Sequence, residues 1–371
     1  MVKQSPIRVA IVGVGNCASA LVQGVEYYKN KSGGVNFELI GGYSASDIEF
    51  VAAWDVDIRK VGSSLHEAIF AQPNCCRVFC QEVENIISPR VRMAPILDGV
   101  SPHMLQHEAS ESFRLSTSTE DTVQDILSQL STADILINYL PVGSQKASEF
   151  WASMCLQSNT AFLNCIPVFI ASNPEWQQKF VDAGLPCIGD DMKSQFGASI
   201  LSQMLQELAI VRGHKVQCHI QQNVGGNTDF LNMKNTERLQ SKKESKENVL
   251  RAPHEKHGRH EGFLFAGPSD FIPYLGDNKI ATFHIEMTGF GGSPVVLDAR
   301  LSVQDSPNSA GVVIDAIRFL KVALELGISG ALKGASAFTQ KTPPVQMSLE
   351  DAKAECEALA KRDLTPFTIK Q

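Results

Sequence analysis

The stretch IRVAIVGVGNCA, residues 7–18, is a short apolar run followed at once by the turn Gly13-x-Gly15-x-x-Ala18. Residues 18–28 then have the apolar spacing of a helix. A strand, a glycine turn and a helix in this order form the context of a dinucleotide-binding fingerprint. The first glycine makes the turn, the second lets a pyrophosphate approach the backbone, and the small Ala18 lets the helix pack on the strand. This stretch therefore predicts a dinucleotide site in the first domain.

The acidic residue that usually follows the fingerprint about 20 residues later is absent from this sequence. The next buried strand is FVAAW, residues 50–54, and Asp55 follows it directly. A carboxylate at the end of the second strand can accept hydrogen bonds from ribose hydroxyls. We therefore predict that Asp55 binds the ribose and that an insertion precedes the second strand.

The chain of 371 residues is long for a single core, so two domains, or one domain with a large insertion, are expected. Its net charge of −7 argues against a protein that binds nucleic acid. Any basic site must be local, which suits a small phosphate better than a polymer. The sequence has no signal-peptide pattern and no apolar run long enough for a membrane span.

The nine cysteines include no C-x-x-C pair, so we expect reduced thiols in a cytoplasmic protein with no metal site. The triplet His254-x-x-His257-x-x-His260 resembles a metal-ligand set only superficially. Its neighbours are charged, and we interpret the triplet as part of a solvated loop.

Further apolar strands are expected at residues 134–139, 161–164 and 186–188, with helices at 149–157 and 175–183 between them. This alternation predicts an α/β fold with a Rossmann-like, doubly wound parallel sheet. Ligands bind at the carboxyl ends of such strands. The loop GDDMKSQFG, residues 189–197, follows one of these ends. Its Asp190 and Asp191 either cap the next helix or face the ligand, and Lys193 and Ser194 are within reach of cofactor or substrate.

From Val216 onward the apolar pattern alternates, which predicts an antiparallel sheet with one apolar face. The segment DSPNSAG, residues 305–311, then opens a long helix with Ser306 as N-cap and Pro307 at the first helical position. We predict a nucleotide-binding domain at residues 1–195, an inserted α+β domain at 196–305, and a segment at 306–371 that returns to the first domain.

A dense polar stretch, NVGGNTDFLNMKNTERLQSKKESK, occupies residues 223–246. Gly225 and Gly226 permit close approach of a ligand to the backbone, and hydrogen-bonding side chains follow them. Lys242 and Lys246 are four residues apart, so on a helix they share one face. Either they form a solvated helix end, or an anion lies between them.

Several long motifs resemble the inositol-1-phosphate synthase family in its shorter, prokaryotic form. They are VAIVGVGNCASALVQGVEYY, GDDMKSQFGA, NVGGNTDFLNM, RLQSKKESK, GDNK, DSPNSAGVVIDAIR and KTPPVQ. The resemblance covers nearly the whole chain. It implies a redox-neutral cyclase that uses bound NAD. Glucose 6-phosphate would be oxidised at C5, closed by an aldol bond between C6 and C1, and reduced again.

The resemblance also implies roles for individual residues. Lys242 would assist proton removal from the C5 hydroxyl, Lys246 and Lys279 would hold the phosphate and the developing enolate, and Lys341 would act on the C1 carbonyl. Asp229 and Asp277 would orient lysines or the nicotinamide. The predicted NAD contacts are Gly13, Gly15, Asn16, Cys17, Ala18, Asp55, Asp191, Ser194, Asp229, Lys242 and Asp305. The predicted substrate contacts are Asn227, Asn232, Lys193 and Ser306.

The family pattern implies a homotetramer formed through the sheet of the inserted domain, with a sugar phosphate as the small-molecule partner. This chain departs from the pattern at residues 199–203, at Gln304, at 338–340 and in a longer 254–260 segment. These departures leave open a related cyclase that closes fructose 6-phosphate to a five-membered carbocycle. A non-catalytic NAD-binding regulator and a simple dehydrogenase are further alternatives.

Overall fold

The computed structural model describes residues 5–81, 83, 88–235, 250–251, 253–258 and 262–363. The largest element of these residues is a seven-stranded sheet with the order β11-β6-β5-β4-β1-β2-β3. Every pair of neighbouring strands in it is parallel. The strands are β1 (Ile7–Val12), β2 (Ile48–Asp55), β3 (Val91–Met93), β4 (Ile135–Asn138), β5 (Ala161–Asn164), β6 (Pro186–Ile188) and β11 (Gly330–Ala331). The strand order reverses beside β1, as in a doubly wound sheet.

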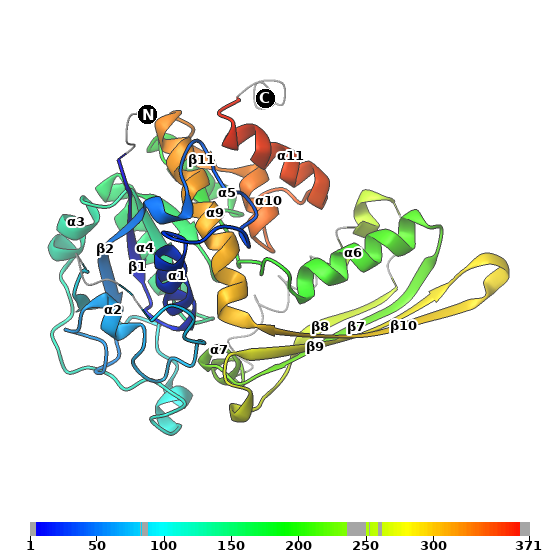
Figure 1. Cartoon of the computed structure of the whole chain (residues 1–371), viewed down its shortest axis with the longest axis horizontal. Coiled ribbons are helices and arrows are strands. Elements are labelled where there is room, and N and C mark those ends of the chain that lie inside the picture. The colour runs from blue at the N-terminus through cyan, green and yellow to red at the C-terminus, as the bar shows by residue number, and fades with distance from the viewer. Residues whose placement is uncertain are drawn as a thin grey trace.

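Helices cover both faces of this sheet, which gives three layers (Figure 1). One core packs the sheet against α1 (Asn16–Tyr27), α9 (Asp305–Glu325), α10 (Lys333–Thr339) and α11 (Leu349–Ala360). The other core packs it against α3 (Val123–Leu130), α4 (Gln145–Ser158) and α5 (Pro174–Asp182). The central strands are buried on both sides, which explains why they are mainly apolar. The predicted α/β, Rossmann-like fold is confirmed.

A second sheet of four strands, in the order β10-β9-β7-β8, extends away from the first. Its strands are β7 (Lys215–Gly225), β8 (Phe263–Phe271), β9 (Asn278–Thr288) and β10 (Pro294–Gln304). Helix α6 (Ala198–Val211) lies along one face, and the short helix α7 (Thr228–Asn232) follows β7. The prediction of a purely antiparallel sheet was wrong, because β7 and β8 pair in parallel. The segment of β8 shows too little alternation to identify it from the sequence.

Helix α9 joins the two parts, because β10 runs into it without a loop (Figure 1). It begins at Asp305 with Gln304 as N-cap, so the prediction of Ser306 as N-cap was wrong. Ser306 is instead the second residue of the helix, where its backbone and hydroxyl donate to Asp277. The predicted domain boundaries at 195/196 and 305/306 stay predictions. Within the described part of the chain, no helix has both the length and the apolar character needed to cross a bilayer.

Candidate functional site

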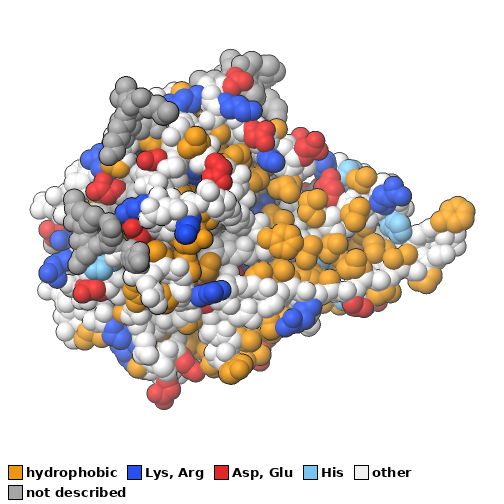
Figure 2. Space-filling view, viewed as in Figure 1, with side chains coloured by type: hydrophobic (Ala, Val, Ile, Leu, Met, Phe, Trp, Pro, Cys, Tyr) orange, Lys and Arg blue, Asp and Glu red, His pale blue; other side chains and the backbone are white. Residues whose placement is uncertain are grey.

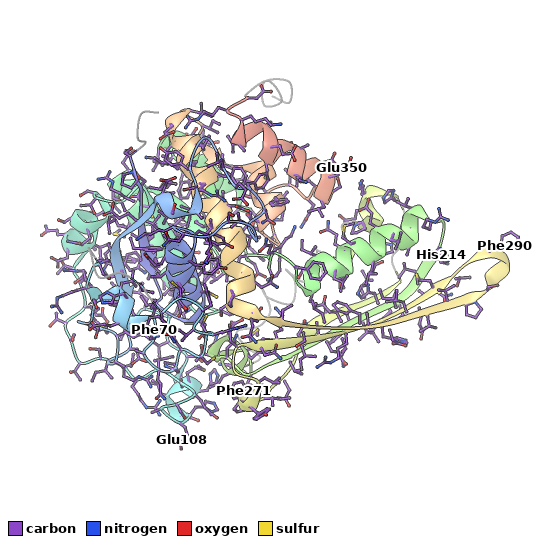
Figure 3. All side chains as sticks on the ribbon, viewed as in Figure 1. Phe70, Glu108, His214, Phe271, Phe290 and Glu350 are labelled. Atoms are coloured by element: carbon purple, nitrogen blue, oxygen red, sulfur yellow. The ribbon has the colours of Figure 1, made fainter. Side chains whose placement is uncertain are left out.

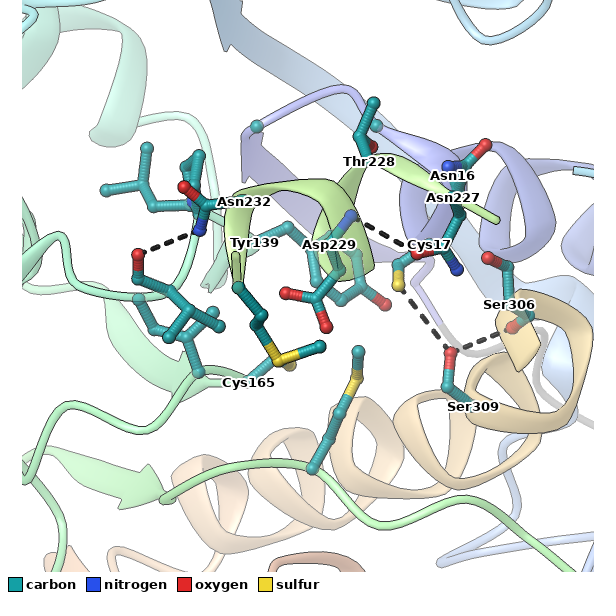
Figure 4. A pocket seen from close by; sticks show the side chains of 18 of the residues that line it. Asn16, Cys17, Tyr139, Cys165, Asn227, Thr228, Asp229, Asn232, Ser306 and Ser309 are labelled. Atoms are coloured by element: carbon teal, nitrogen blue, oxygen red, sulfur yellow. Dashed lines mark hydrogen bonds between the residues drawn. The ribbon is translucent and has the colours of Figure 1, made fainter. Parts of the chain in front are cut away.

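A cavity of about 260 Å³ opens at the carboxyl ends of the parallel strands, where the two sheets meet. Residues from both sheets line it, and Figure 4 shows the part between α7, the start of α1 and the start of α9. The predicted site residues that line it are Gly13, Gly15, Asn16, Cys17, Asp55, Asp191, Ser194, Asn227, Asp229, Asn232, Lys279, Asp305, Ser306 and Lys341. Residues more than 300 positions apart in the sequence therefore share one cavity.

The two fingerprint glycines have different structural roles. Gly13 has φ +92°, and a Cβ atom there would lie 2.6 Å from the carbonyl oxygen of Tyr139. Gly15 has no atom within 4 Å of the position of such a Cβ, although it also lines the cavity. Gly13 is therefore needed by the fold, while Gly15 keeps space open. No side chain caps the start of α1 within the described residues, so its first amides suit an anion.

Both backbone polar groups of Val14, which lies between these glycines, are hydrogen-bonded to side chains. Its N–H donates to Asp55 Oδ2 at 2.7 Å, and its carbonyl oxygen accepts from Lys60 Nζ at 2.7 Å. Lys60 also donates to Asn74 Oδ1 at 2.9 Å. Burial lowers the pKa of Lys60. The glycine turn is therefore held by Asp55 at the end of β2 and by Lys60 and Asn74, which follow it in the sequence. All three residues line the cavity.

Asn16 and Cys17 form the first turn of α1. The side-chain oxygen of Asn16 accepts from the backbone N–H groups of Cys75 and Cys76 at 2.7 and 3.0 Å. Burial, with the nearby carboxylates of Asp305 and Asp277, raises the pKa of Cys17 to about 12. Cys17 is therefore a neutral thiol at physiological pH. Ala18 is fully buried in the core behind the cavity wall.

Lys341 enters the cavity from the segment after α10. Its ammonium group pairs with Asp191 Oδ1 at 2.8 Å, and its side chain is 13% exposed. The backbone N–H of Lys341 donates to the carbonyl of Asp191. Lys193 is not part of the cavity lining, because its amine donates to the carbonyl of Ala337 at 2.7 Å. Burial and the charge of Lys341 lower the pKa of Lys193 to about 8.

Lys279 is the second residue of β9, and it lines the cavity from the small sheet. Its ammonium group pairs with Asp305 Oδ1 at 2.8 Å. Asp277 lies behind this pair and is almost fully buried. It accepts from Asn227 Nδ2 at 3.2 Å and from the Ser306 hydroxyl at 2.7 Å. Asp277 therefore joins α7, β9 and α9 rather than lining the cavity.

The buried carboxyl of Asp277 predicts a pH-dependent stability. Burial raises its pKa from 3.8 to about 6, and the Asp305 charge adds to this. The folded state thus retains a proton that the unfolded state releases, so this group's contribution to the free energy of unfolding increases as the pH falls. From pH 7 to pH 5, we expect the stability of the wild type relative to Asp277→Asn to rise by about 1 kcal/mol. Urea unfolding at both pH values measures this, and a change of opposite sign would contradict it.

The residues of α7 are oriented by its N-cap. Asn227 Oδ1 accepts from the N–H groups of Asp229 and Phe230 at 3.1 and 3.3 Å. Asn232 Nδ2 donates to the carbonyl of Val142 at 3.0 Å (Figure 4), while its Oδ1 is buried without a hydrogen-bond partner in the described structure. That oxygen is an acceptor available to a ligand. Lys242 and Lys246 lie outside the described residues.

Several residues that line the cavity were not predicted from the sequence. They are Lys60, Asn74, Gln221, Asn223 and Ser309. Alternation along β7 offered one signal, because Gln221 and Asn223 occupy core-facing positions where apolar residues are usual. The interpretation of His254 as part of a solvated loop was wrong. Residues 253–256 are helical, and His254 is buried against Gln206.

Comparison with known proteins places this geometry in a family. The sequence model of the family described as myo-inositol-1-phosphate synthase matches residues 197–306. An inositol-3-phosphate synthase of Corynebacterium glutamicum is 44% identical over 365 residues, which cover 95% of this chain and 98% of that protein. An inositol-3-phosphate synthase of Mycobacterium tuberculosis H37Rv is 43% identical over 357 residues, with 95% of each chain covered.

Solved structures share the fold of this chain. The crystal structure of Ari2 is 30% identical and has a TM-score of 0.77, covering 96% of this chain and 99% of the other. A myo-inositol-1-phosphate synthase-related protein from Thermotoga maritima shares the fold with a TM-score of 0.77 at 23% identity, covering 96% and 98% of the two chains. The identity and coverage of the bacterial relatives show that this chain belongs to the myo-inositol-1-phosphate synthase family of enzymes.

Proposed function

We propose that this protein is an NAD-dependent, redox-neutral cyclase that converts glucose 6-phosphate to 1L-myo-inositol 1-phosphate. The observation that supports it most is the cavity that contains both the glycine turn and two lysine ammonium groups, Lys279 and Lys341. A simple oxidoreductase has no need for several cations around one small substrate. A cyclase does, because oxidation, enolisation and aldol closure each build negative charge on oxygen.

The residues of the turn fit NAD. Gly15 leaves open space beside the uncapped start of α1, which suits a pyrophosphate. Asp55 stands at the end of β2, although its two oxygens already accept three backbone N–H groups, from Val14, Val56 and Asp57. Each carboxylate oxygen has two lone pairs, so acceptor capacity remains for ribose hydroxyls. When bound, NAD would supply reversible hydride acceptance at C5 of the sugar.

The two described lysines would manage charge and protons at different places. Lys341 would donate to the carbonyl oxygen that becomes a hydroxyl in ring closure, while Asp191 orients its amine. Lys279, held by Asp305, would bind phosphate or enolate oxygens. Asn232 would contact the sugar from α7, and Asp229 would orient a lysine or the nicotinamide. By the family resemblance, Lys242 would take the proton of the C5 hydroxyl, and Lys246 would share the phosphate.

The test is a phosphorus and carbon NMR time course with purified protein, catalytic NAD and glucose 6-phosphate. We expect conversion to inositol phosphate with no accumulation of NADH at 340 nm, because the hydride returns to the product. Net NADH formation would indicate a dehydrogenase instead. NAD binding without turnover of any sugar phosphate would favour a regulator.

One observation supports a second candidate, a cyclase that closes fructose 6-phosphate to a five-membered carbocycle. Ser199 lines the cavity, and it lies in the segment 199–203 that departs from the family pattern. A changed wall can accept a different sugar while the lysines keep the same aldol chemistry. A parallel tube with fructose 6-phosphate distinguishes the two, since conversion of only this ester would select the second candidate.

We also propose a homotetramer assembled through the small sheet and α6. Apolar side chains are exposed there (Figure 2), and Figure 3 shows Phe290 at the far tip of the β9–β10 hairpin. The exposed apolar side chains of this part include Phe196, Met204, Leu208, Val211, Phe263, Phe290 and Val296. Surfaces of this kind usually mark protein interfaces.

All nine cysteines are free, which supports a reducing, cytoplasmic location.

The assembly can be tested with Leu208→Glu, because Leu208 is 60% exposed on α6. A carboxylate buried at an apolar interface is costly, so we expect the variant to elute as smaller species than the wild type. Light scattering coupled to gel filtration measures the mass. Glu108→Gln, at an exposed position of the larger domain far from α6 (Figure 3), is the control. A monomeric wild type, or an unchanged variant, would contradict the proposal.

A further inference from the structure

A continuous chain of buried polar side chains starts at the cavity wall and runs beneath α6. None of its members is more than 3% exposed. Two of them, Gln221 and Asn223, also line the cavity. The members are Asn223, Gln221 and His219 on β7, Ser202 and Gln206 on α6, and His254 in the helical residues 253–256.

The position of these residues follows from simple periodicity. Residues 219, 221 and 223 alternate along β7 and therefore face the same side of the sheet, toward α6 (Figure 1). Ser202 and Gln206 are four residues apart, so they share one face of α6. Two polar rows thus meet where a helix and a sheet usually bury apolar side chains. Such a buried network is tolerated only if its groups are paired.

The hydrogen positions nearest the cavity can be assigned from the carbonyl of Gly267. That oxygen only accepts, so Asn223 must turn its amide nitrogen toward it, at 2.8 Å. Asn223 Oδ1 then accepts from Gln221 Nε2 at 3.1 Å. The side-chain oxygen of Gln221, Oε1, accepts from the Ser202 hydroxyl at 2.8 Å. Ser202 has used its single hydrogen, so its oxygen must accept the next bond.

The next bond fixes the tautomer of His219. Its Nε2 lies 3.0 Å from Ser202 Oγ and must donate to it. Its Nδ1 then accepts from Gln206 Nε2 at 2.9 Å, and Gln206 Oε1 accepts from His254 Nε2 at 2.8 Å. Burial, together with the nearby His254, lowers the pKa of His219 to about 4, so its imidazole is neutral at pH 7. Each hydrogen bond of the chain is therefore donated in the same direction, starting at His254 and ending at Asn223 in the cavity wall.

We propose that His219 is a positioning residue for the substrate, acting through Ser202 to hold Gln221 and Asn223 with N–H donors available at the cavity wall. Each of these two amide nitrogens uses one hydrogen inside the chain and keeps a second one. The ligand group that fits is an oxygen acceptor, such as a phosphate or carbonyl oxygen of the sugar phosphate. This inference rests on the proposed function, since it concerns the substrate of the same cavity.

The inference gives a role to two features that the proposed chemistry leaves unused. Ser202 belongs to the segment 199–203, where the sequence departs from the family pattern. His254 belongs to the histidine triplet, to which the sequence assigned no function. In the structure both are members of a single hydrogen-bonded chain.

The experiment compares Ser202→Ala, His219→Leu and His219→Gln with the wild type. The first two variants leave a buried amide of the chain unpaired, so they should raise the KM for glucose 6-phosphate about 10-fold or more. The KM for NAD should stay within about twofold. His219→Gln should recover most of the loss, because its amide can supply both an N–H donor to Ser202 and an acceptor oxygen to Gln206.

Coupling between the two positions gives a sharper test. If His219 acts only through Ser202, the double variant Ser202→Ala/His219→Leu should be no weaker than the worse single variant. Ser153→Ala is the control, since Ser153 donates only to Glu149 of its own helix α4. Unchanged KM values for the sugar phosphate would overturn the positioning role. Variants that lower the melting temperature and whose effects on this KM simply add in the double variant would also overturn it.

The outcomes separate this inference from the proposed function. Turnover of glucose 6-phosphate by the wild type tests the function alone. If the wild type converts neither sugar phosphate, the function fails, and calorimetric binding of glucose 6-phosphate then tests the positioning role. Weaker binding by Ser202→Ala and His219→Leu supports it. Equal binding by all variants, or no binding by the wild type, overturns it.

Discussion

Replacing Lys341 by methionine is expected to reduce kcat by about 1000-fold, because a preorganised charged donor at a developing oxyanion is worth about 10²–10³ in rate. The ammonium group of Lys341 is held at 2.8 Å by Asp191 and reaches the cavity wall. Methionine retains much of the apolar stem but removes the charge and all three donors. NAD affinity should change by less than about threefold, since no protein atom lies within 4 Å of the Cβ position of Gly15, where the pyrophosphate is proposed to bind. Phosphorus NMR of product formation measures the rate.

The matched control is Lys321→Met. The side chain of Lys321 is 12% exposed and pairs with Asp134 at 3.4 Å, so it resembles Lys341 in burial and pairing. It does not belong to the cavity lining. We expect this variant to keep wild-type kcat while showing the same kind of stability loss. A Lys341→Met enzyme that is as active as the control would remove Lys341 from the mechanism.

Gly13→Ala is expected to reduce the stability of the fold, whereas Gly15→Ala is expected to weaken NAD binding. At Gly13 the backbone has φ +92°, and the new Cβ would meet the Tyr139 carbonyl at 2.6 Å. Left-handed strain and a clash with backbone together should cost about 3 kcal/mol or more of stability. At Gly15 the new methyl group meets no protein atom within 4 Å. It should leave stability almost unchanged and instead occupy the space proposed for the pyrophosphate.

Two measurements separate these effects. Thermal unfolding without cofactor should show a large loss of stability for Gly13→Ala and little change for Gly15→Ala. Calorimetric titration with NAD should show at least about a 10-fold weaker affinity for Gly15→Ala, or 1.4 kcal/mol. If Gly15→Ala binds NAD as the wild type does, the pyrophosphate does not approach this glycine. Equal stability of the two variants would contradict the assigned role of Gly13.

The extent to which sequence predicted the fold differs between the two sheets. Strands β1, β5 and β6 begin and end at the predicted residues, because a strand buried on both faces is mainly apolar and stands out from the polar loops around it. The pairing of β7 with β8 was not predictable in this way. It depends on which edge of β7 remains free after β9 has paired, and that is a property of the assembled sheet.

The site shows the same division. Residue types and spacing identified the glycine turn and Asp55 as candidates, the family resemblance implied Lys279 and Lys341, and the structure brings all of them to one cavity. Lys193 could not be told from them by sequence, since a lysine in a polar loop can turn either way. Only the packed structure shows that its amine donates to Ala337 behind the wall.

By itself, the sequence determined the parallel sheet, the glycine turn and the family, because each rests on local patterns of polarity and backbone permissiveness. The tertiary structure decided which polar residues meet. Lys60 reaches Val14 across 46 positions and His254 reaches Gln206 across 48, and no local pattern encodes either contact. Burial then made these contacts consequential, since a polar group removed from water must find a partner within the protein.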